Sequence, residues 1–445
     1  MAISGKNESK LQKAVLSCDM FTTGYFVMFL LFFVPYVMTA CGTLVLWFLP
    51  IAFLLPFVTL PLFYSFVHRT DTLLFGRYHL VMPLSGFISA LFFVVAFSAS
   101  SVGAGSVCAV FFGAVVFVSS VMIYRYCSFS VRARLLSEDI TAASPYSVGI
   151  TFAGCVAALI TFFGFMYYDG ATAYINTAYV FAGACAVITL IQYLATYYNI
   201  PKLSGRRVQS VKNVFRAFYS GLDRRMYFSA LLFGAAFAVL AATETYMAIA
   251  FGLGIARSAA VAGVCVLCFA ACDGICVAFV KQRSKMLSVI SLCGYAAAAA
   301  LIVVSVCVPL DGKALYAAIT VSAGVTGACG ALSVRQTKLR FLTIKPRITS
   351  GVVFILLQLT ACAAQAVATL VCAAQAFALE RAGTALVFIG GGAVAAALAV
   401  AAFVCAGKKR AKTQAAPGLS YEPNTSELDG GAEYANAVDR DETNN

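Results

Sequence analysis

The chain has 445 residues, of which 62% are hydrophobic and 11% are charged, and its formal net charge is +13. A soluble globular protein carries about 25% charged residues, so this composition excludes an ordinary soluble domain. The basic residues are spread among short loops between apolar runs, which excludes a continuous nucleic-acid-binding patch and indicates a membrane protein.

Twelve apolar runs of about 20 residues follow one another along the chain, each long enough to cross a bilayer. Residues 1–18 are polar and basic, so we expect a cytoplasmic N-terminus without a cleavable signal peptide. The first two runs lie close together, and the division between them is the least sharply defined. The predicted spans are 19–41, 44–67, 79–99, 105–126, 146–167, 173–198, 227–250, 258–280, 287–309, 314–334, 350–377 and 384–406.

A basic loop at 199–226 divides these spans into two sets of six. It carries seven Lys and Arg residues and one acid, Asp223. We therefore expect an all-α integral membrane protein with an N-terminal six-helix bundle at 19–198 and a C-terminal one at 227–406. Residues 407–445 are polar and acidic and are predicted to be a disordered cytoplasmic tail. Twelve spans in two matching halves are typical of secondary transporters built from repeats.

The charge distribution fixes the predicted orientation. With a cytoplasmic N-terminus and twelve spans, 28 of the 31 Lys and Arg residues fall inside and three fall outside, at Arg257, Lys313 and Arg381. Cytoplasmic loops of membrane proteins carry such an excess of positive charge. The sequence thus predicts that both termini are cytoplasmic, and we place the protein in the cell (inner) membrane.

Three acidic residues fall in or at the edge of spans: Asp19, Glu244 and Asp273. A charge at the centre of a bilayer costs at least about 2.5–3.5 kcal/mol, so each requires a reason. Asp19 is either an interfacial helix cap or a ligand for substrate or a proton. Glu244, flanked by Thr243, Thr245 and Tyr246, either joins a polar cluster facing a cavity or lies at the interface. Asp273, in the middle of the eighth span, is paired or functional.

Other polar residues interrupt the apolar spans. Tyr124 and Arg125 close the fourth span, where the arginine either anchors the helix by reaching to the surface or serves as a gate. On the eleventh span, Gln358, Gln365 and Gln375 are predicted to share one face. That face either lines a cavity or makes hydrogen bonds between helices.

Four cysteines, Cys265, Cys268, Cys272 and Cys276, line one face of the eighth span. With no histidine nearby, we interpret them as small apolar side chains rather than as a metal site. Only two histidines are present, and no nucleotide-binding glycine motif is found. The sequence therefore predicts neither an enzyme nor a bound metal or cofactor.

Several short motifs give the chain a resemblance to a known family. They are Leu16–Phe21 at the first span, His68–Asp71 with Gly76–Tyr78 after the second, Ser137–Asp139 after the fourth, and Lys345–Arg347 with Gly351 and Gln358 at the eleventh. Together they resemble the major facilitator superfamily, and within it the glycoside–pentoside–hexuronide:cation symporters, of which the melibiose permeases are members. A related branch carries lysophospholipids.

The resemblance implies roles for particular residues. Asp71 and Arg77 would form a charged gate at the inner helix ends, and Asp19 would bind substrate or a proton. The sequence also departs from the family: spans 2 and 4 hold no acid where the family has its cation site, and Gln358 stands where the sugar symporters have a lysine.

These observations lead to a functional hypothesis. We expect a secondary active transporter that moves a small organic solute, sugar-like or glycoside-like and less readily a lysolipid, by alternating access. Asp273, with Glu244 or Asp19, would couple transport to H+ in preference to Na+, because a sodium site requires several converging oxygens. The alternative is a non-transporting, partner-binding membrane protein that has lost the symport site. We expect a monomer whose partners are the lipid bilayer and a small molecule, not nucleic acid.

Overall fold

The computed structural model describes residues 15–40, 44–69, 78, 80–98, 106–135, 145–170, 172–197, 224–279, 284–342, 350–382 and 385–407. All regular secondary structure within these ranges is helical. The helices belong to one compact unit that ends at Ala406. The predicted central loop and acidic tail lie outside the described residues, apart from Arg224–Met226 and Gly407 at their edges.

In the described part of the first half, seven helical segments supply the six predicted spans. The second span is split by Pro56 into two short helices that follow each other directly. Proline lacks an amide hydrogen and cannot continue the backbone hydrogen bonds of a helix, so α3 ends just before Pro56 and α4 begins at it. The segments are α2 (Asp19–Ala40), α3 (Leu44–Leu54), α4 (Pro56–Arg69), α5 (Val81–Ala96), α7 (Ser106–Leu135), α8 (Pro145–Tyr168) and α9 (Ala173–Tyr197).

The second half supplies six uninterrupted helices. Their exposed residues are mainly apolar, as expected for surfaces that face lipid rather than water. They are α12 (Arg224–Ala250), α13 (Ile255–Phe279), α14 (Ser284–Cys307), α15 (Gly312–Leu342), α16 (Ser350–Ala382) and α17 (Val387–Gly407).

Ten of the twelve predicted spans are confirmed within the described residues. Ten helical stretches are long and apolar enough to cross a membrane, and α2 and the shorter apolar α5 supply the other two predicted spans. Two helices extend well beyond their predicted spans: α7 ends at Leu135 rather than 126, and α15 at Leu342 rather than 334. Hydropathy reports the thickness of the hydrocarbon, whereas a helix satisfies its own backbone in lipid and in water and can continue past the boundary.

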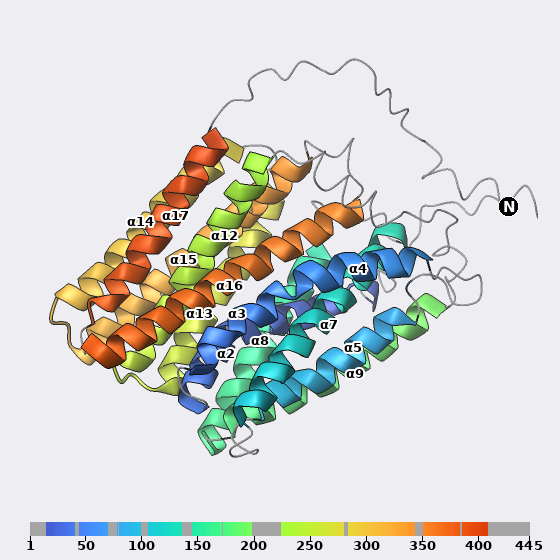
Figure 1. The fold of residues 1–445 in the computed structure, drawn as a ribbon, viewed down its shortest axis with the longest axis horizontal. Coiled ribbons are helices and arrows are strands. Elements are labelled where there is room, and N and C mark those ends of the chain that lie inside the picture. Colours follow the sequence, from blue (N-terminus) through green and yellow to red (C-terminus); the bar gives the residue numbers. More distant parts are fainter. Residues whose placement is uncertain are drawn as a thin grey trace, which may run out of the picture. The chain divides into compact units, whose positions relative to one another are not determined.

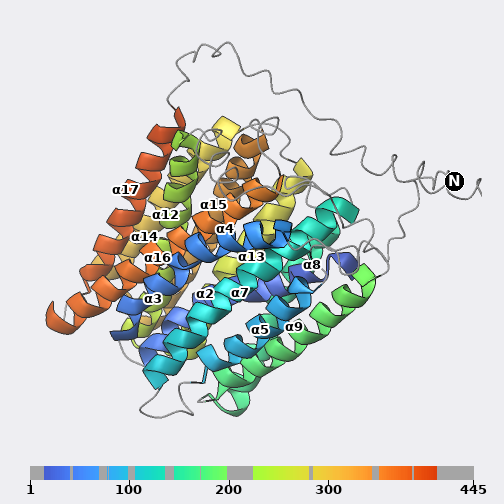
Figure 2. The ribbon, with the colours of Figure 1, turned by 45° about the vertical axis from the view of Figure 1, so that its right-hand side comes forward.

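The two halves meet along a few helix pairs. Within the first half α5 packs against α7 and α9, and α2 against α8; within the second, α15 packs against α13 and α14, and α12 against α16. Between the halves, α16 lies along α3 and contacts α4 and α7, while α13 packs against α8 and α2, and α2 against α12. Figures 1 and 2 both show α16 beside α3, although about 300 residues separate them in the sequence.

Close packing of α2 on α8 depends on two glycines. A Cβ at Gly24 would collide with the Thr151 carbonyl oxygen, and a Cβ at Gly154 would collide with the Phe21 carbonyl oxygen. Each glycine therefore lies against the backbone of the opposite helix. Small residues permit such approach between membrane helices, and here they fix the helix that carries Asp19.

Candidate functional site

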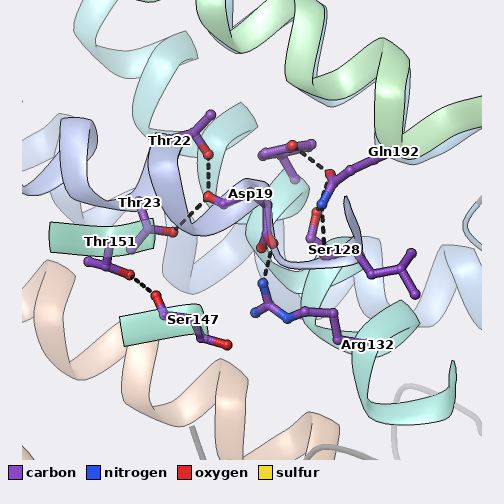
Figure 3. A network of polar contacts seen from close by, with 10 residues as sticks. Asp19, Thr22, Thr23, Ser128, Arg132, Ser147, Thr151 and Gln192 are labelled. Carbon is purple, nitrogen blue, oxygen red and sulfur yellow. Dashed lines mark hydrogen bonds and ion pairs between the residues drawn. The ribbon is translucent and has the colours of Figure 1, made fainter. Parts of the chain in front are cut away.

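Asp19 begins α2 and forms an ion pair with Arg132 near the end of α7 (Figure 3). Both side chains are only 2% exposed. The backbone carbonyl of Asp19 also accepts hydrogen bonds from Thr22 Oγ1 at 2.6 Å and Thr23 Oγ1 at 3.3 Å. Asp19 is thus held within the N-terminal half by a fully buried cation.

Tyr124 belongs to a second polar network in the same half. Figure 3 shows two other members of this network, Ser128 and Gln192. The Tyr124 hydroxyl donates to Gln192 Oε1 at 2.7 Å, and Ser128 Oγ donates to the same oxygen at 3.2 Å. Gln192 Nε2 in turn donates to the Leu16 carbonyl at 3.2 Å. The network joins α7 and α9 to the turn before α2, so Tyr124 serves helix packing in this conformation.

Glu244 lies in α12, six residues before its end, and is fully buried. Its Oε1 lies 2.5 Å from Ser322 Oγ and 2.8 Å from Thr326 Oγ1, both on α15. Its Oε2 has no hydrogen-bond partner. The polar cluster predicted around Glu244 therefore exists, but its members come from α15 rather than from the neighbouring threonines.

Thr243 pairs instead with Gln375 of α16, whose Nε2 lies 3.2 Å from Thr243 Oγ1. Gly391 of α17 lies directly over this pair, where any Cβ would collide with the Gln375 amide nitrogen. Gln375 therefore makes a hydrogen bond between helices, which is one of the two alternatives given for the polar residues of this span. The ten residues from Gln365 to Gln375 are about 80° short of three full helical turns, and this rotation directs Gln375 toward α12.

Asp273 is half-buried in α13, six residues before the end of the helix. Its Oδ1 is buried and has no hydrogen-bond partner. The thiol of Cys276, one turn further on, interacts electrostatically with both Asp273 and Arg335 of α15. Asp273 thus lies nearer to the C-terminal end of α13 than to its middle.

Arg125 and Gln358 lie where α7 of the first half meets α16 of the second. The Arg125 guanidinium lies over the ring of Phe26, 5.5 Å from its centroid, and is only partly exposed. Gln358 is 4% exposed, and neither its amide nitrogen nor its amide oxygen has a partner. Gln365, two turns further along α16, is also buried. Arg125 and Gln358 thus belong to the two helices that meet at this boundary.

The predicted gate residues Asp71 and Arg77 lie outside the described residues. Five residues whose side chains pair in these polar networks were not recognised from the sequence: Ser128, Arg132, Gln192, Ser322 and Thr326. The i, i+7 spacing of Arg125 and Arg132 places both on one face of α7 and was an available signal. Isolated serines, threonines and glutamines in apolar spans give no such signal, because their partners are far away in sequence.

No family model and no curated protein matches the sequence. Solved structures do match. The crystal structure of the nucleoside transporter NupG is similar with a TM-score of 0.63 and 14% identity, over 90% of this chain and all of that one. A bacterial homologue of the iron transporter ferroportin, in an outward-facing state, is similar with a TM-score of 0.56 and 14% identity, over 89% of this chain and 98% of that one.

These similarities concern the fold. The chain is a multi-pass integral membrane protein whose fold is similar to those of the nucleoside transporter NupG and the ferroportin homologue.

Proposed function

We propose that the protein is a secondary active transporter that moves a small glycoside-like solute by alternating access. The observation that carries the proposal is the buried amide of Gln358, which has no partner, on a helix of the second half that meets the helix of the half-buried Arg125 in the first half. A burial this costly is expected where a solute completes the interactions. The similarity to a nucleoside transporter supports a glycoside-like solute, since a nucleoside is itself a glycoside.

Transport is coupled to protons through Glu244 in this proposal. Ser322 Oγ lies 2.5 Å from Glu244 Oε1 and also 3.2 Å from the Ala298 carbonyl oxygen. A hydroxyl has one proton to donate, so it cannot serve both acceptors fully. A protonated Glu244 removes the conflict, because the carboxyl donates to Ser322 and Ser322 donates to the carbonyl.

The second carboxyl oxygen supports the same interpretation. An ionised Glu244 would leave negative charge on Oε2 in a fully buried position without a donor, which costs more than leaving a neutral carbonyl oxygen there. Within the described residues, the Cys265 thiol of α13 is a further titratable group that interacts with Glu244. Two hydroxyls and one carboxyl do not form the set of converging oxygens that Na+ requires, so H+ is the favoured coupling ion.

Uptake by proteoliposomes tests the proposal. Wild-type protein should accumulate a solute from a panel of sugars, glycosides and nucleosides when an inward proton gradient is imposed. Glu244→Gln should abolish accumulation but retain exchange of solute across the membrane. Asp273→Asn, assayed in parallel, tests whether the second acid contributes.

Glu380→Gln is the matched control, because Glu380 is exposed near the end of α16. It should accumulate solute like the wild type. Absence of both uptake and exchange for every member of the panel would refute a transporter of this class and favour a non-transporting membrane protein. If Glu244→Gln accumulated solute at the wild-type level, coupling through Glu244 would be refuted, whereas the transport function itself would not.

A further inference from the structure

The contact between α7 and α16 has a defined register. The rings of Phe129 and Phe354 stack in parallel, with centroids 4.2 Å apart and an interplanar angle of 2°. Further from the inner ends of both helices, Arg125 interacts electrostatically with Cys362. Phe129 and Arg125 are one turn apart on α7, and Phe354 and Cys362 are two turns apart on α16. Gln358, one turn from each of the latter, therefore lies on the face of α16 that is directed at α7.

Gln358 is an unexplained polar group in this face. Both atoms of its amide lack a partner although the side chain is 4% exposed. Each unsatisfied buried group costs about 1–3 kcal/mol. A helix that holds leucine and alanine around this position gains nothing from such a residue unless a further molecule satisfies the amide.

Arg125 is an unexplained charge beside the same face. In the described part of the chain it has no hydrogen bond and no ion pair, and its guanidinium lies over Phe26. It interacts electrostatically with Asp19, but that carboxylate is paired with Arg132. These three residues together carry one positive charge in excess. Arginine remains protonated in proteins, so this excess charge attracts an anion.

We propose that Arg125 and Gln358 bind an anionic group, a carboxylate or a phosphate, carried by the transported solute. The guanidinium donates to the oxygens of the anion, and the Gln358 amide nitrogen donates to the same group. The Gln358 amide oxygen is then available to a hydroxyl of the solute. This inference rests on the proposed transport function and specifies the charge of the solute that the protein moves.

The aromatic residues define the surroundings of this site. Phe26 forms the floor under the guanidinium, and the Phe129–Phe354 stack lies one turn from Gln358 toward the predicted cytoplasmic ends of α7 and α16. A solute held between Arg125 and Gln358 is therefore separated from that end by two stacked rings. Binding and gating thus involve neighbouring turns of the same two helices.

The test compares three probes that share a sugar ring: glucose, glucuronate and glucose 6-phosphate. Binding to the full-length protein in lipid nanodiscs is measured by calorimetry, and uptake is measured in proteoliposomes. We expect glucuronate or glucose 6-phosphate to bind at least ten times more tightly than glucose. The arm that binds identifies the anion as a carboxylate or a phosphate.

Arg125→Gln should remove this preference and leave the three probes within a factor of about three of one another. Gln358→Glu provides a second variant, because its carboxylate would neutralise Arg125 and exclude the anion. Arg257→Gln is the matched control: Arg257 also lies over an aromatic ring, that of Tyr316 at 5.8 Å, but it is exposed near the start of α13.

The inference is overturned if the wild type binds neither anionic probe, or if Arg125→Gln retains the preference. Uptake of neutral solutes by a wild type that ignores the anions would leave the transport function standing while rejecting the anion site. Failure of uptake with tight binding of an anion to Arg125 would reject the transport function and keep the site.

Discussion

Asp19 and Arg132 form an ion pair between the start of α2 and the end of α7 in which each side chain is only 2% exposed. Removing one partner of a buried pair leaves an uncompensated charge, which typically costs about 3–5 kcal/mol. We therefore predict that Asp19→Ala and Arg132→Ala each lower the melting temperature in detergent strongly.

The exchanged double variant Asp19→Arg with Arg132→Asp should recover part of the lost stability. Lys313→Ala, at an exposed position at the start of α15, serves as the control and should melt like the wild type. Equal melting temperatures for Asp19→Ala and Lys313→Ala would show that the pair contributes nothing to stability.

The glycine contact between α2 and α8 gives a second prediction. Gly154→Leu should destabilise the protein by at least about 1–3 kcal/mol, because the side chain would enter the backbone of α2. At Gly149 on the same helix, an added Cβ would have no neighbouring atom within 4 Å, so Gly149→Leu should have little effect. The measurement is the melting temperature of each variant. Similar decreases for Gly154→Leu and Gly149→Leu would contradict the close approach of α2 and α8.

The third prediction concerns α17. Gly391→Ala should disturb the Thr243–Gln375 pair, since the added methyl group would occupy the position of the Gln375 amide. At its neighbour Gly390 an added methyl group would meet nothing within 4 Å, so Gly390→Ala is a control that differs by one residue. Thermal unfolding should separate the two variants, and a Gly391→Ala variant as stable as Gly390→Ala would refute this packing.

The fourth prediction concerns the aromatic stack between the halves. Phe129→Ala should weaken the contact of α7 with α16 and open the predicted cytoplasmic side, so that the buried Cys362 thiol becomes reactive. The rate of Cys362 alkylation, followed by mass spectrometry of its peptide, provides the measurement. Phe112→Ala removes an aromatic contact with Phe92 inside the first half and should leave that rate unchanged. An unchanged rate in Phe129→Ala would exclude the stack as a gate.

The sequence predicted the twelve spans because bilayer thickness imposes a length on each apolar run. It also singled out Asp19, Glu244 and Arg125, because a charge in such a run is conspicuous. It did not predict that Ser322 would meet Glu244, since 78 residues separate them and the pairing depends on how α12 packs against α15. Nor did it distinguish the partnered Gln375 from the unpartnered Gln358, because helix rotation and neighbouring helices decide that difference.

The break at Pro56 bears on the energy that a cycle of opening and closing would require. The hydrogen bonds on either side persist, from the Leu55 amide to the Ile51 carbonyl at 3.0 Å and from the Thr59 amide to the Leu55 carbonyl at 3.1 Å. Proline itself has no amide hydrogen to lose, so the span can bend at this point without breaking a backbone hydrogen bond. Both α3 and α4 contact α16. A bend at Pro56 would therefore let each of the two short helices keep its own contact with α16. In the proposed alternating access, every 1.4 kcal/mol by which a solute prefers one arrangement of the helices over the other shifts their ratio about tenfold.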